Sequence, residues 1–461
     1  MTHQTVTTST LTERLVAAGV EHVITPDDPR FADQLAGFNA HVVHGPDVVV
    51  AAVREADVRA AVTVARETGA PLVTIGHGHG FVTGADGGVA LTTIGMAGVE
   101  VDAEQRTARV GAGTRWSEVV EAAAPHGLAP LCGSAPHVGV MGYLLGGGIG
   151  PVARTYGYAA DHVSSFRVVV GTGEALVVDH DRHPDLYWAL RGGKGGLGVV
   201  TEAVVELVPL STLHAGGFFF SGDDAGEVLH TFATWSATLP ETVTTSIALL
   251  RLPPLPFVPE PIRGRFVVHV RLAALVDEDE VEAIVAPWRS GPRPLIDAFG
   301  VIPYTAIGTV HSDPTEPMAV VEGGRLLSEF TSETVEALLA AAGPGVDVPL
   351  VAIEVRQLGG ALARTPVVPN AVGGRHAACA LHVVGAPVPE LLTTVVPAAI
   401  TALFGALAPW TDGAQVNFIG NANAPEELAT CWPEDVRARL ATVRDTYDPS
   451  GVFPYDGHGG R

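Results

Sequence analysis

The sequence has 461 residues, of which 47% are hydrophobic and 17% charged, a balance typical of a globular protein with two or three domains. Its 50 acidic and 27 basic residues give a formal net charge of −23, which argues against nucleic acid or an anionic membrane as a partner, since both would be repelled. The three cysteines are widely spaced and odd in number, so we expect no disulfides, no zinc site and a cytoplasmic protein.

The N-terminal residues have no Lys or Arg and no apolar core before Arg14, so we expect no signal peptide and a mature chain that begins here. One uncharged run, residues 391–410, reaches membrane-spanning length. Because Pro397, Pro409 and several threonines interrupt it, we expect a buried helix instead.

The first 210 residues are predicted to contain short strands and helices. A strand and a helix over residues 46–69, followed by a strand over 71–75, form a β-α-β unit that ends on the glycine loop 76–80. A short helix is also plausible near the N-terminus, at residues 12–20. Further strands are expected at 89–93, 98–101, 107–110, 165–170, 175–178 and 199–208, and helices at 117–126 and 185–191.

Beyond Leu210 the composition changes to phenylalanine-rich strands and helices, which indicates a separate α+β layer. Near the C-terminus we expect a strand at residues 415–420 and an arginine-rich helix at 433–447. The other elements expected are strands at 216–221, 266–272 and 381–384 and helices at 278–286 and 333–342.

Residues 131–150, LCGSAPHVGVMGYLLGGGIG, contain seven glycines and predict a loop rather than a regular helix or strand. Glycine lets backbone N–H groups approach a flat or anionic ligand closely. The alternative is a tight internal turn that packs on other backbone. Together with the glycine loop 76–80, this stretch could hold the two ends of one long cofactor.

Other glycine motifs do not fit their usual context. Residues 193–198 match G-x-G-x-x-G, but a helix precedes them and a strand follows, the reverse of a dinucleotide site. Residues 148–153 fit a looser form, yet the carboxylate expected farther along is missing. A nicotinamide site is therefore not expected, and the signatures of acyl and phosphoryl transfer are missing as well.

Two histidines in the first glycine loop, His77 and His79, could bind a metal with His126 or His137. No nearby Cys, Glu or Asp completes a recognisable ligand set, and the flanking glycines favour contact with a larger ligand. We expect no metal site.

Several motifs, in this order, resemble the FAD-linked oxidases of the berberine bridge enzyme type, within the vanillyl-alcohol oxidase (PCMH-type) superfamily. The resemblance spans nearly the whole chain. The motifs are PLVTIGHGHG (71–80), GVEVD (98–102), TARVGAG (107–113), PHVGVMGYLLGGG (136–148), ALRGG (189–193), EVRQLGGA (354–361), VNF (416–418) and YDP (447–449).

The resemblance implies a two-domain α+β fold. An FAD-binding domain would occupy residues 1–210, a substrate domain with an antiparallel sheet covered by helices residues 211–410, and a segment returning to the FAD-binding domain residues 411–461. The loop 76–80 would hold the pyrophosphate, and residues 134–150 would line the flavin. The residues expected to bind FAD are Gly76, His77, Gly78, His79, Gly80, Ser134, His137, Val138, Gly139, Gly142, Tyr143, Gly146, Gly147, Gly148, Gly150, Val200 and Asn417.

By the same resemblance a histidine would form a covalent bond to the 8α-methyl of the flavin. Counting from Pro71 places it on His79, with His77 as the alternative. Many family members add a bond from a cysteine, but that position is Ala135 here and Cys132 lies three residues earlier. We therefore expect a single bond.

The implied chemistry is transfer of a hydride from an alcohol, sugar or secondary-metabolite carbon to flavin N5, with O2 as electron acceptor. Val138 matches a position where a small apolar residue leaves a path for oxygen, which favours an oxidase over a dehydrogenase. Partners would be a small-molecule substrate and O2. The alternatives are a dehydrogenase using another acceptor and a flavin-binding protein without turnover.

The catalytic base is the weakest part of the resemblance. A family tyrosine is replaced by Gln415 and a family glutamate by Arg364, and neither can act as an ordinary base near neutral pH. Tyr143 is the first candidate and Glu354 the second, with packing or ion pairing as their alternative roles. Tyr304 and His376 are further candidates, and substrates that need no strong base would also fit.

Overall fold

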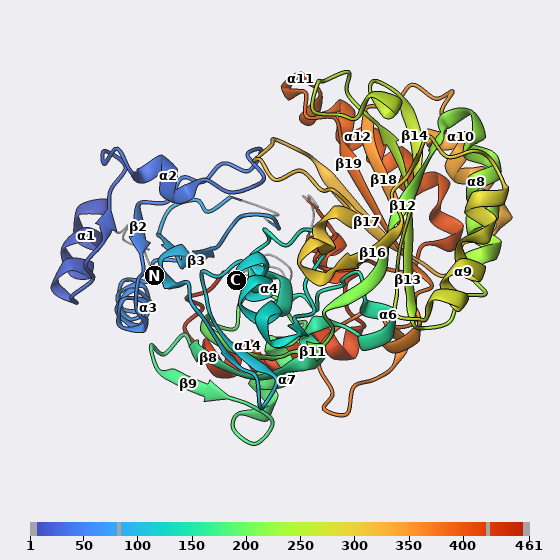
Figure 1. Cartoon of the computed structure of the whole chain (residues 1–461). Coiled ribbons are helices and arrows are strands. Elements are labelled where there is room, and N and C mark those ends of the chain that lie inside the picture. The colour runs from blue at the N-terminus through green and yellow to red at the C-terminus, as the bar shows by residue number, and fades with distance from the viewer. Residues whose placement is uncertain (1–6, 81–83, 421–424, 455–461) are drawn as a thin grey trace.

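The computed structural model describes residues 7–80, 84–420 and 425–454 (Figure 1). A four-stranded sheet near the N-terminus has the order β1-β2-β4-β3, in which β2, β4 and β3 are parallel and β1 is antiparallel. The predicted β-α-β unit is confirmed, although β2 and β3 both pair with β4 rather than with each other. The strands are β1 (Val23–Ile24), β2 (Val48–Ala51), β3 (Leu72–Ile75) and β4 (Val89–Thr92), with α1 (Thr8–Ala17), α2 (Phe31–Leu35) and α3 (Glu55–Thr68) around them.

Local sequence explains the helix of this unit. The side chain of Asp57 accepts from the backbone of Arg54 at the start of α3, and Gly69 ends the helix in the left-handed conformation with φ 71°. The helix buries Val58, Ala61 and Val62 on the sheet.

A second, five-stranded antiparallel sheet has the order β5-β6-β10-β8-β9. Its strands agree with predicted ones and are β5 (Val99–Asp102), β6 (Thr107–Gly111), β8 (Val163–Val169), β9 (Ala175–Val178) and β10 (Val199–Glu206). Around it lie α4 (Trp116–Ala123), α5 (Val140–Leu145), α6 (Ala153–Tyr156), α7 (Pro184–Leu190) and the two-stranded pair β7 (Leu128–Ala129) and β11 (Val208–Pro209).

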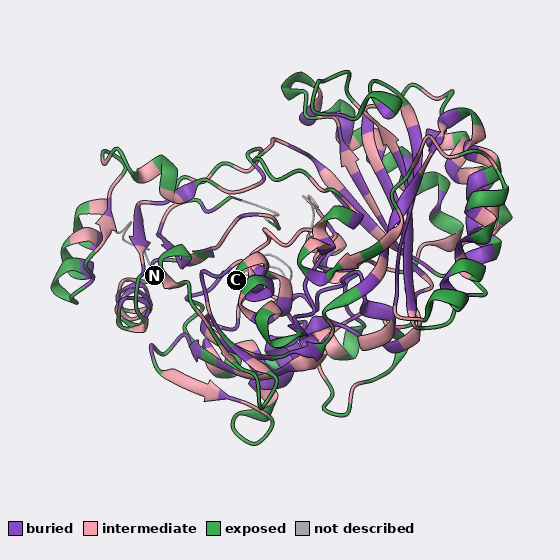
Figure 2. Cartoon of the chain, in the orientation of Figure 1, coloured by how far each residue is buried: buried purple, intermediate pink, exposed green. Residues whose placement is uncertain are grey.

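The largest sheet is antiparallel and has the order β15-β12-β14-β13-β18-β19-β17, with β16 pairing to β12. Helices cover its outer face, and Figure 2 shows buried strands beneath helices that are exposed outside. The strands are β12 (Thr212–Ser221), β13 (Val243–Arg251), β14 (Phe266–Ala274), β15 (Ile296–Asp297), β16 (Gly300–Pro303), β17 (Glu322–Leu327), β18 (Leu350–Gln357) and β19 (Cys379–Gly385). The helices are α8 (Ala225–Ser236), α9 (Glu278–Ser290), α10 (Ser332–Ala342), α11 (Pro389–Leu392) and α12 (Val395–Ala406).

After this sheet, α13 (Pro425–Ala429) and α14 (Glu434–Tyr447) lead to the C-terminus. The backbone N–H of Leu72 in β3 donates to the carbonyl of Val452 at 2.8 Å, and Val452 and Phe453 belong to the core of the first sheet. Val452 and Phe453 therefore contact the first sheet. The division at residues 210 and 410 stays a prediction.

The structure differs from the predicted elements in two places near the cavity described below. The strand expected at 415–420 is wrong, because residues 416–418 form a turn that the Phe418 N–H to Gln415 carbonyl bond of 2.8 Å closes. The stretch 131–150 is not wholly a loop, since α5 forms within it and buries Val140, Met141 and Leu144. That apolar spacing outweighs the low helix propensity of Gly142.

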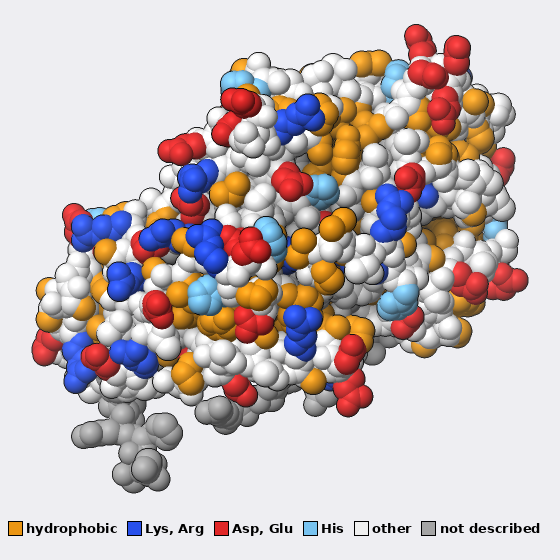
Figure 3. All heavy atoms as spheres, turned by 90° about the horizontal axis from the view of Figure 1, so that it is seen from below, with side chains coloured by type: hydrophobic (Ala, Val, Ile, Leu, Met, Phe, Trp, Pro, Cys, Tyr) orange, Lys and Arg blue, Asp and Glu red, His pale blue; other side chains and the backbone are white. Residues whose placement is uncertain are grey.

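The apolar run 391–410 contains α12, which buries Val396, Ile400 and Leu403 on the large sheet. None of the helices that the structure describes is long and apolar enough to cross a membrane. On the face shown in Figure 3, acidic side chains lie among arginines.

Candidate functional site

A cavity of about 430 Å³ lies where β3, the glycine-rich segment around α5, the loop before β10 and the C-terminal residues meet. Its wall is mostly backbone of glycines and apolar side chains, with few polar groups. The lining residues are Leu72, Val73, Thr74, Gly76, His77, Gly78, His79, Gly80, Thr93, Ala112, Gly133, Ser134, Ala135, Val138, Gly139, Met141, Gly142, Tyr143, Leu145, Ile149, Lys194, Gly195, Gly196, Gly198, Val199, Val200, Arg356, Asn417, Phe418, Phe453 and Pro454.

Most residues expected to bind FAD lie in this wall. They include the whole loop 76–80 and, from separate parts of the chain, Val200 and Asn417; the others are Ser134, Val138, Gly139, Gly142 and Tyr143. The cavity wall, as far as the structure describes it, does not contain His137, Gly146, Gly147, Gly148 or Gly150.

The glycines outside the wall serve internal packing. A Cβ atom on Gly148 would lie 2.3 Å from Cε1 of Tyr143, and one on Gly150 would lie 2.1 Å from the carbonyl oxygen of Cys132. A Cβ on Gly146 would lie 2.0 Å from Oδ1 of Asn417. Gly146, Gly148 and Gly150 therefore fit the alternative of a tightly packed internal turn.

Two glycines in the wall behave differently. An added Cβ on Gly76 or on Gly142 would have no protein atom within 4 Å. At these positions the absence of a side chain leaves open space in the cavity instead of making room for the chain itself.

The imidazole of His79 lines this cavity and has no hydrogen-bond partner within the described parts of the chain. Its ring stacks on Phe38, with centroids 4.2 Å apart and planes 11° apart, and lies 5.0 Å from the ring of His137. Both ring nitrogens are buried without a hydrogen-bond partner among the described residues. Burial, aided by repulsion from His137 and Arg115, lowers the pKa of His79 to about 3, so the ring is neutral.

His77 is held differently. Its Nε2 lies 2.8 Å from the carbonyl oxygen of Gly113, a contact in which Nε2–H donates. Its ring also lies against Gly139, where a Cβ would come within 2.7 Å of Cδ2. Burial lowers the pKa of His77 as well. One nitrogen of His77 is therefore engaged by backbone.

Lys194 and Asn417 meet in the same wall. The ammonium of Lys194 donates to the carbonyl of Gly142 at 2.8 Å and to Oδ1 of Asn417 at 2.6 Å, while Nδ2 of Asn417 donates to the carbonyl of Tyr143 at 2.8 Å. Burial lowers the pKa of Lys194 to about 8.

Lys194 is not among the site residues predicted from the sequence. The fact that it is the only lysine in the sequence could have pointed to it. Gly195, Gly196 and Gly198 of the segment 193–198 line the cavity.

Tyr143 lies with its ring against backbone. Its hydroxyl is buried without a hydrogen-bond partner among the described residues, and burial raises its pKa well above the usual value. The hydroxyl therefore keeps its proton at neutral pH. This environment supports the packing role, and the catalytic role stays a prediction.

Glu354 lies on β18 in a buried cluster outside the described cavity wall, whereas Arg356 of the same strand belongs to the wall. Its carboxylate contacts Arg356 at 3.0 Å, Arg271 at 3.1 Å and His311 at 3.3 Å. Burial acts to raise the pKa of Glu354, but these neighbours outweigh it and hold the pKa well below its usual range. Glu354 is thus an ionised carboxylate with low basicity.

The other candidate positions are engaged elsewhere. The Tyr304 hydroxyl donates to the carbonyl of Pro130 at 2.5 Å, and His376 is exposed beside Asp412 at 2.8 Å. Oε1 of Gln415 accepts from the N–H of Val416 at 2.8 Å. Arg364 forms an exposed pair with Glu241 at 2.6 Å.

The residues present fit an FAD molecule. The glycine loop offers backbone to a diphosphate, the wall at Gly142 leaves open space where a side chain would otherwise lie, and Lys194 adds a positive charge. The unpartnered nitrogens of His79 are polar atoms that a ligand would have to satisfy.

A metal centre fits less well. Within the described parts of the chain, the histidines His77, His79 and His137 do not bring three ligand atoms together. The group that does, Asp179, His180 and Asp181, lies at an exposed turn away from the cavity wall.

Comparisons with known proteins identify relatives that are linked to FAD. Residues 46–179 match the FAD binding domain family. FAD-linked oxidoreductase YgaK of Bacillus subtilis is 26% identical over 465 residues, which cover 94% of this chain and 95% of that protein. (R)-6-hydroxynicotine oxidase of Paenarthrobacter nicotinovorans is 34% identical over 200 residues, which cover 42% of this chain and 43% of that protein.

Solved structures show the same fold. The crystal structure of 6-hydroxy-D-nicotine oxidase from Arthrobacter nicotinovorans has a TM-score of 0.83 at 23% identity and covers 96% of this chain and 98% of its own. Glucooligosaccharide oxidase from Acremonium strictum, studied for its 6-S-cysteinyl, 8α-N1-histidyl FAD, has a TM-score of 0.83 at 20% identity and covers 97% and 98%. The predicted α+β fold is confirmed.

Proposed function

We propose that this chain, an FAD-linked oxidoreductase with the vanillyl-alcohol oxidase type of fold, is an oxidase acting on an alcohol, sugar or secondary-metabolite carbon. The observation that carries the proposal is the cavity wall, in which glycine backbone and a neutral, unpartnered His79 face one space. Bound FAD would supply hydride acceptance at N5 and reoxidation by O2.

His79 is the proposed covalent attachment point. A neutral imidazole has the nitrogen lone pair that a bond to the 8α-methyl carbon requires, and neither nitrogen of His79 has a hydrogen-bond partner among the described residues. His77, in contrast, uses Nε2 on the carbonyl of Gly113. Cys132 is buried beside Tyr304, and burial raises its pKa to about 11, which supports a single bond.

The protonation states of the two catalytic candidates specify how each would act. Tyr143 would act as a hydrogen-bond donor, because its raised pKa keeps the hydroxyl protonated, and Glu354 as a fixed carboxylate that orients Arg271 and Arg356. Neither is suited to take a proton from a hydroxyl near neutral pH. We therefore propose substrates from which a hydride is removed without a strong protein base.

Val138, a small apolar residue in the cavity wall, supports O2 as the acceptor. The proposed partners are O2 and one small-molecule substrate. The three free, buried cysteines support the proposed cytoplasmic location.

The attachment is tested with His79→Ala and His77→Ala. We expect the purified protein to be yellow and to keep its flavin after acid precipitation, and we expect His79→Ala to lose that retention while His77→Ala keeps it. If the flavin of His79→Ala is still retained after acid precipitation, the covalent bond would be assigned to His77 instead. A properly folded wild-type protein without FAD would contradict the proposed function.

The oxidase activity is tested with a panel of alcohols, sugars and phenolic metabolites, scored by flavin bleaching without oxygen. Admission of air should restore the yellow colour rapidly with formation of peroxide. A bleached flavin that air restores only slowly would indicate a dehydrogenase with another acceptor. A flavin that no substrate bleaches, but that light reduces, would favour a binding protein without turnover.

A further inference from the structure

The backbone of Lys194 is held in an uncommon conformation. Lys194 lies in the loop between α7 and β10 and has a φ of 65°, in the left-handed region that side-chain-bearing residues rarely adopt. Its N–H donates to the carbonyl of Leu145 at 2.8 Å, and so does the N–H of Gly192 at 3.1 Å. The end of α5 therefore fixes the loop so that the side chain enters the cavity, a strained position of the kind found at functional sites.

The ammonium of Lys194 has only neutral partners. It donates to the Gly142 carbonyl and to Oδ1 of Asn417, and no ion pair within the described parts of the chain includes it. Lys194 is half-buried, and a cation partly withdrawn from water without a counter-charge costs free energy, which is why burial lowers its pKa to about 8. An anionic ligand in the cavity would offset that cost.

Lys194 also stands between the two glycine segments. Its Nζ lies 3.9 Å from the place that a Cβ on Gly80 would occupy, and it bonds Gly142 on the other side. Asn417 is fixed through its bond to the Tyr143 carbonyl, and Gly146 leaves room for it. One side chain thus reaches both segments that face the ligand.

We propose that Lys194 is the residue that pairs with a negative charge of the bound FAD, either the diphosphate or the pyrimidine edge of the ring, where charge accumulates on reduction. This inference rests on the proposed function. The shared chemistry is a charge-assisted N–H donor to an anionic oxygen or nitrogen. In this role Lys194 is a positioning and tuning residue for the cofactor.

Because the sequence has one lysine, an amine reagent reports on Lys194 alone apart from the α-amino group. We expect acetic anhydride at pH 8 to acetylate Lys194 in flavin-free protein at least about tenfold faster than in FAD-loaded protein, since an ion pair removes the reactive free amine. The α-amino group is the internal control. Equal rates at Lys194 with and without FAD would overturn the proposal.

Lys194→Met removes the charge and keeps a similar side-chain length, and Lys194→Arg restores the charge. Both are made in the His79→Ala background, where we expect the flavin to dissociate, and thermal unfolding checks that each variant folds. Pairing with the diphosphate predicts that Lys194→Met weakens FAD binding at least about tenfold and leaves riboflavin binding unchanged.

Pairing with the ring predicts a different result. Lys194→Met would then weaken sulfite binding to the bound flavin at least about tenfold and lower its reduction potential, because sulfite addition and reduction both place negative charge on the ring. In either case Lys194→Arg should recover most of the loss. The proposal would be overturned if FAD affinity and sulfite affinity both stayed within about twofold of the parent and the reduction potential did not change.

The two proposals fail separately. Wild-type protein that lacks FAD would contradict the proposed function. FAD-loaded protein in which Lys194→Met behaves like its parent would contradict only the role of Lys194.

Discussion

At the scale of one residue, His79 shows how burial sets the protonation state of a side chain. The ring stacks on Phe38 near His137, its buried nitrogens have no hydrogen-bond partner among the described residues, and the pKa falls to about 3. The neutral ring has two consequences. Its nitrogens are available for a covalent bond, and the folded state disfavours the protonated form of the ring.

The second consequence predicts a dependence of stability on pH. The unfolded chain protonates His79 near pH 6.5 and the folded flavin-free chain only near 3, so unfolded protein binds the proton first. The contribution of His79 to the free energy of unfolding is therefore complete above about pH 6.5 and is lost as the pH falls toward 3.

Urea unfolding of flavin-free protein between pH 7 and pH 4 measures this loss. We expect His79→Phe, which keeps a ring on Phe38 but cannot titrate, to remove part of the pH dependence, whereas His126→Phe at the exposed surface should retain it. An unchanged slope in His79→Phe would contradict the assigned burial.

At the scale of an element, the segment around helix α5 contains both glycines that are packed against the chain and a glycine that faces the cavity. Gly148, just after the helix, has φ 80° and faces the Tyr143 ring, whereas Gly142 within the helix faces open space. The two positions form a matched pair for substitution by alanine.

We expect Gly148→Ala to lower the free energy of unfolding by about 1–3 kcal/mol or more, because a Cβ would overlap Tyr143 in a backbone conformation that alanine avoids. Gly142→Ala should keep or raise stability by up to about 1 kcal/mol, since alanine favours a helix, but should weaken FAD binding. Chemical unfolding and flavin content measure the two effects. A Gly142→Ala protein that binds FAD normally would remove Gly142 from the cofactor site.

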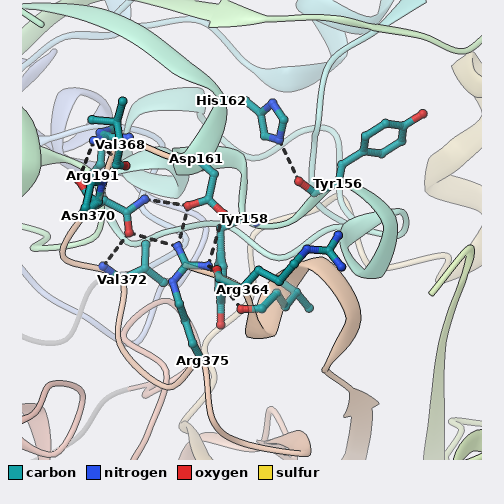
Figure 4. A network of polar contacts seen from close by, with 12 residues as sticks. Tyr156, Tyr158, Asp161, His162, Arg191, Arg364, Val368, Asn370, Val372 and Arg375 are labelled. Carbon is teal, nitrogen blue, oxygen red and sulfur yellow. Dashed lines mark hydrogen bonds and ion pairs between the residues drawn. The ribbon is translucent and has the colours of Figure 1, made fainter. Parts of the chain in front are cut away.

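A buried network joins the large sheet to the first part of the molecule at the scale of the whole chain (Figure 4). Asp161 accepts from Nη2 of Arg375 at 2.5 Å and from Nδ2 of Asn370 at 2.6 Å. Arg191, after α7, donates to the carbonyls of Val368 at 3.2 Å and Pro369 at 2.8 Å. The connection between β18 and β19 is thereby fixed to the residues that support the cavity wall.

We expect Asp161→Asn to lower the free energy of unfolding by about 3–5 kcal/mol, because it leaves the largely buried Arg375 without its counter-charge. The control is Glu241→Gln, which breaks the exposed pair with Arg364 and should cost less than about 1 kcal/mol. Both are measured by urea unfolding. Equal small losses would show that the network does not stabilise the fold.

The sequence by itself determined the order and type of most elements and the glycine loop that carries His79. Periodic apolar residues and glycine stops are local signals, so β2, α3 and β3 could be predicted within a few residues. The turn at 416–418 could not, because Asn417 is fixed by the distant Tyr143 carbonyl and not by its neighbours.

Only the tertiary structure decided what the site residues do. It showed that Gly148 and Gly150 make room for the chain whereas Gly142 faces open space in the cavity, which composition cannot distinguish. It also brought Lys194 to Asn417, far apart in sequence, because the loop before β10 folds onto the end of α5. The preference of a segment for helix, strand or turn depends on its own residues, whereas burial and charge pairing depend on which segments meet in space.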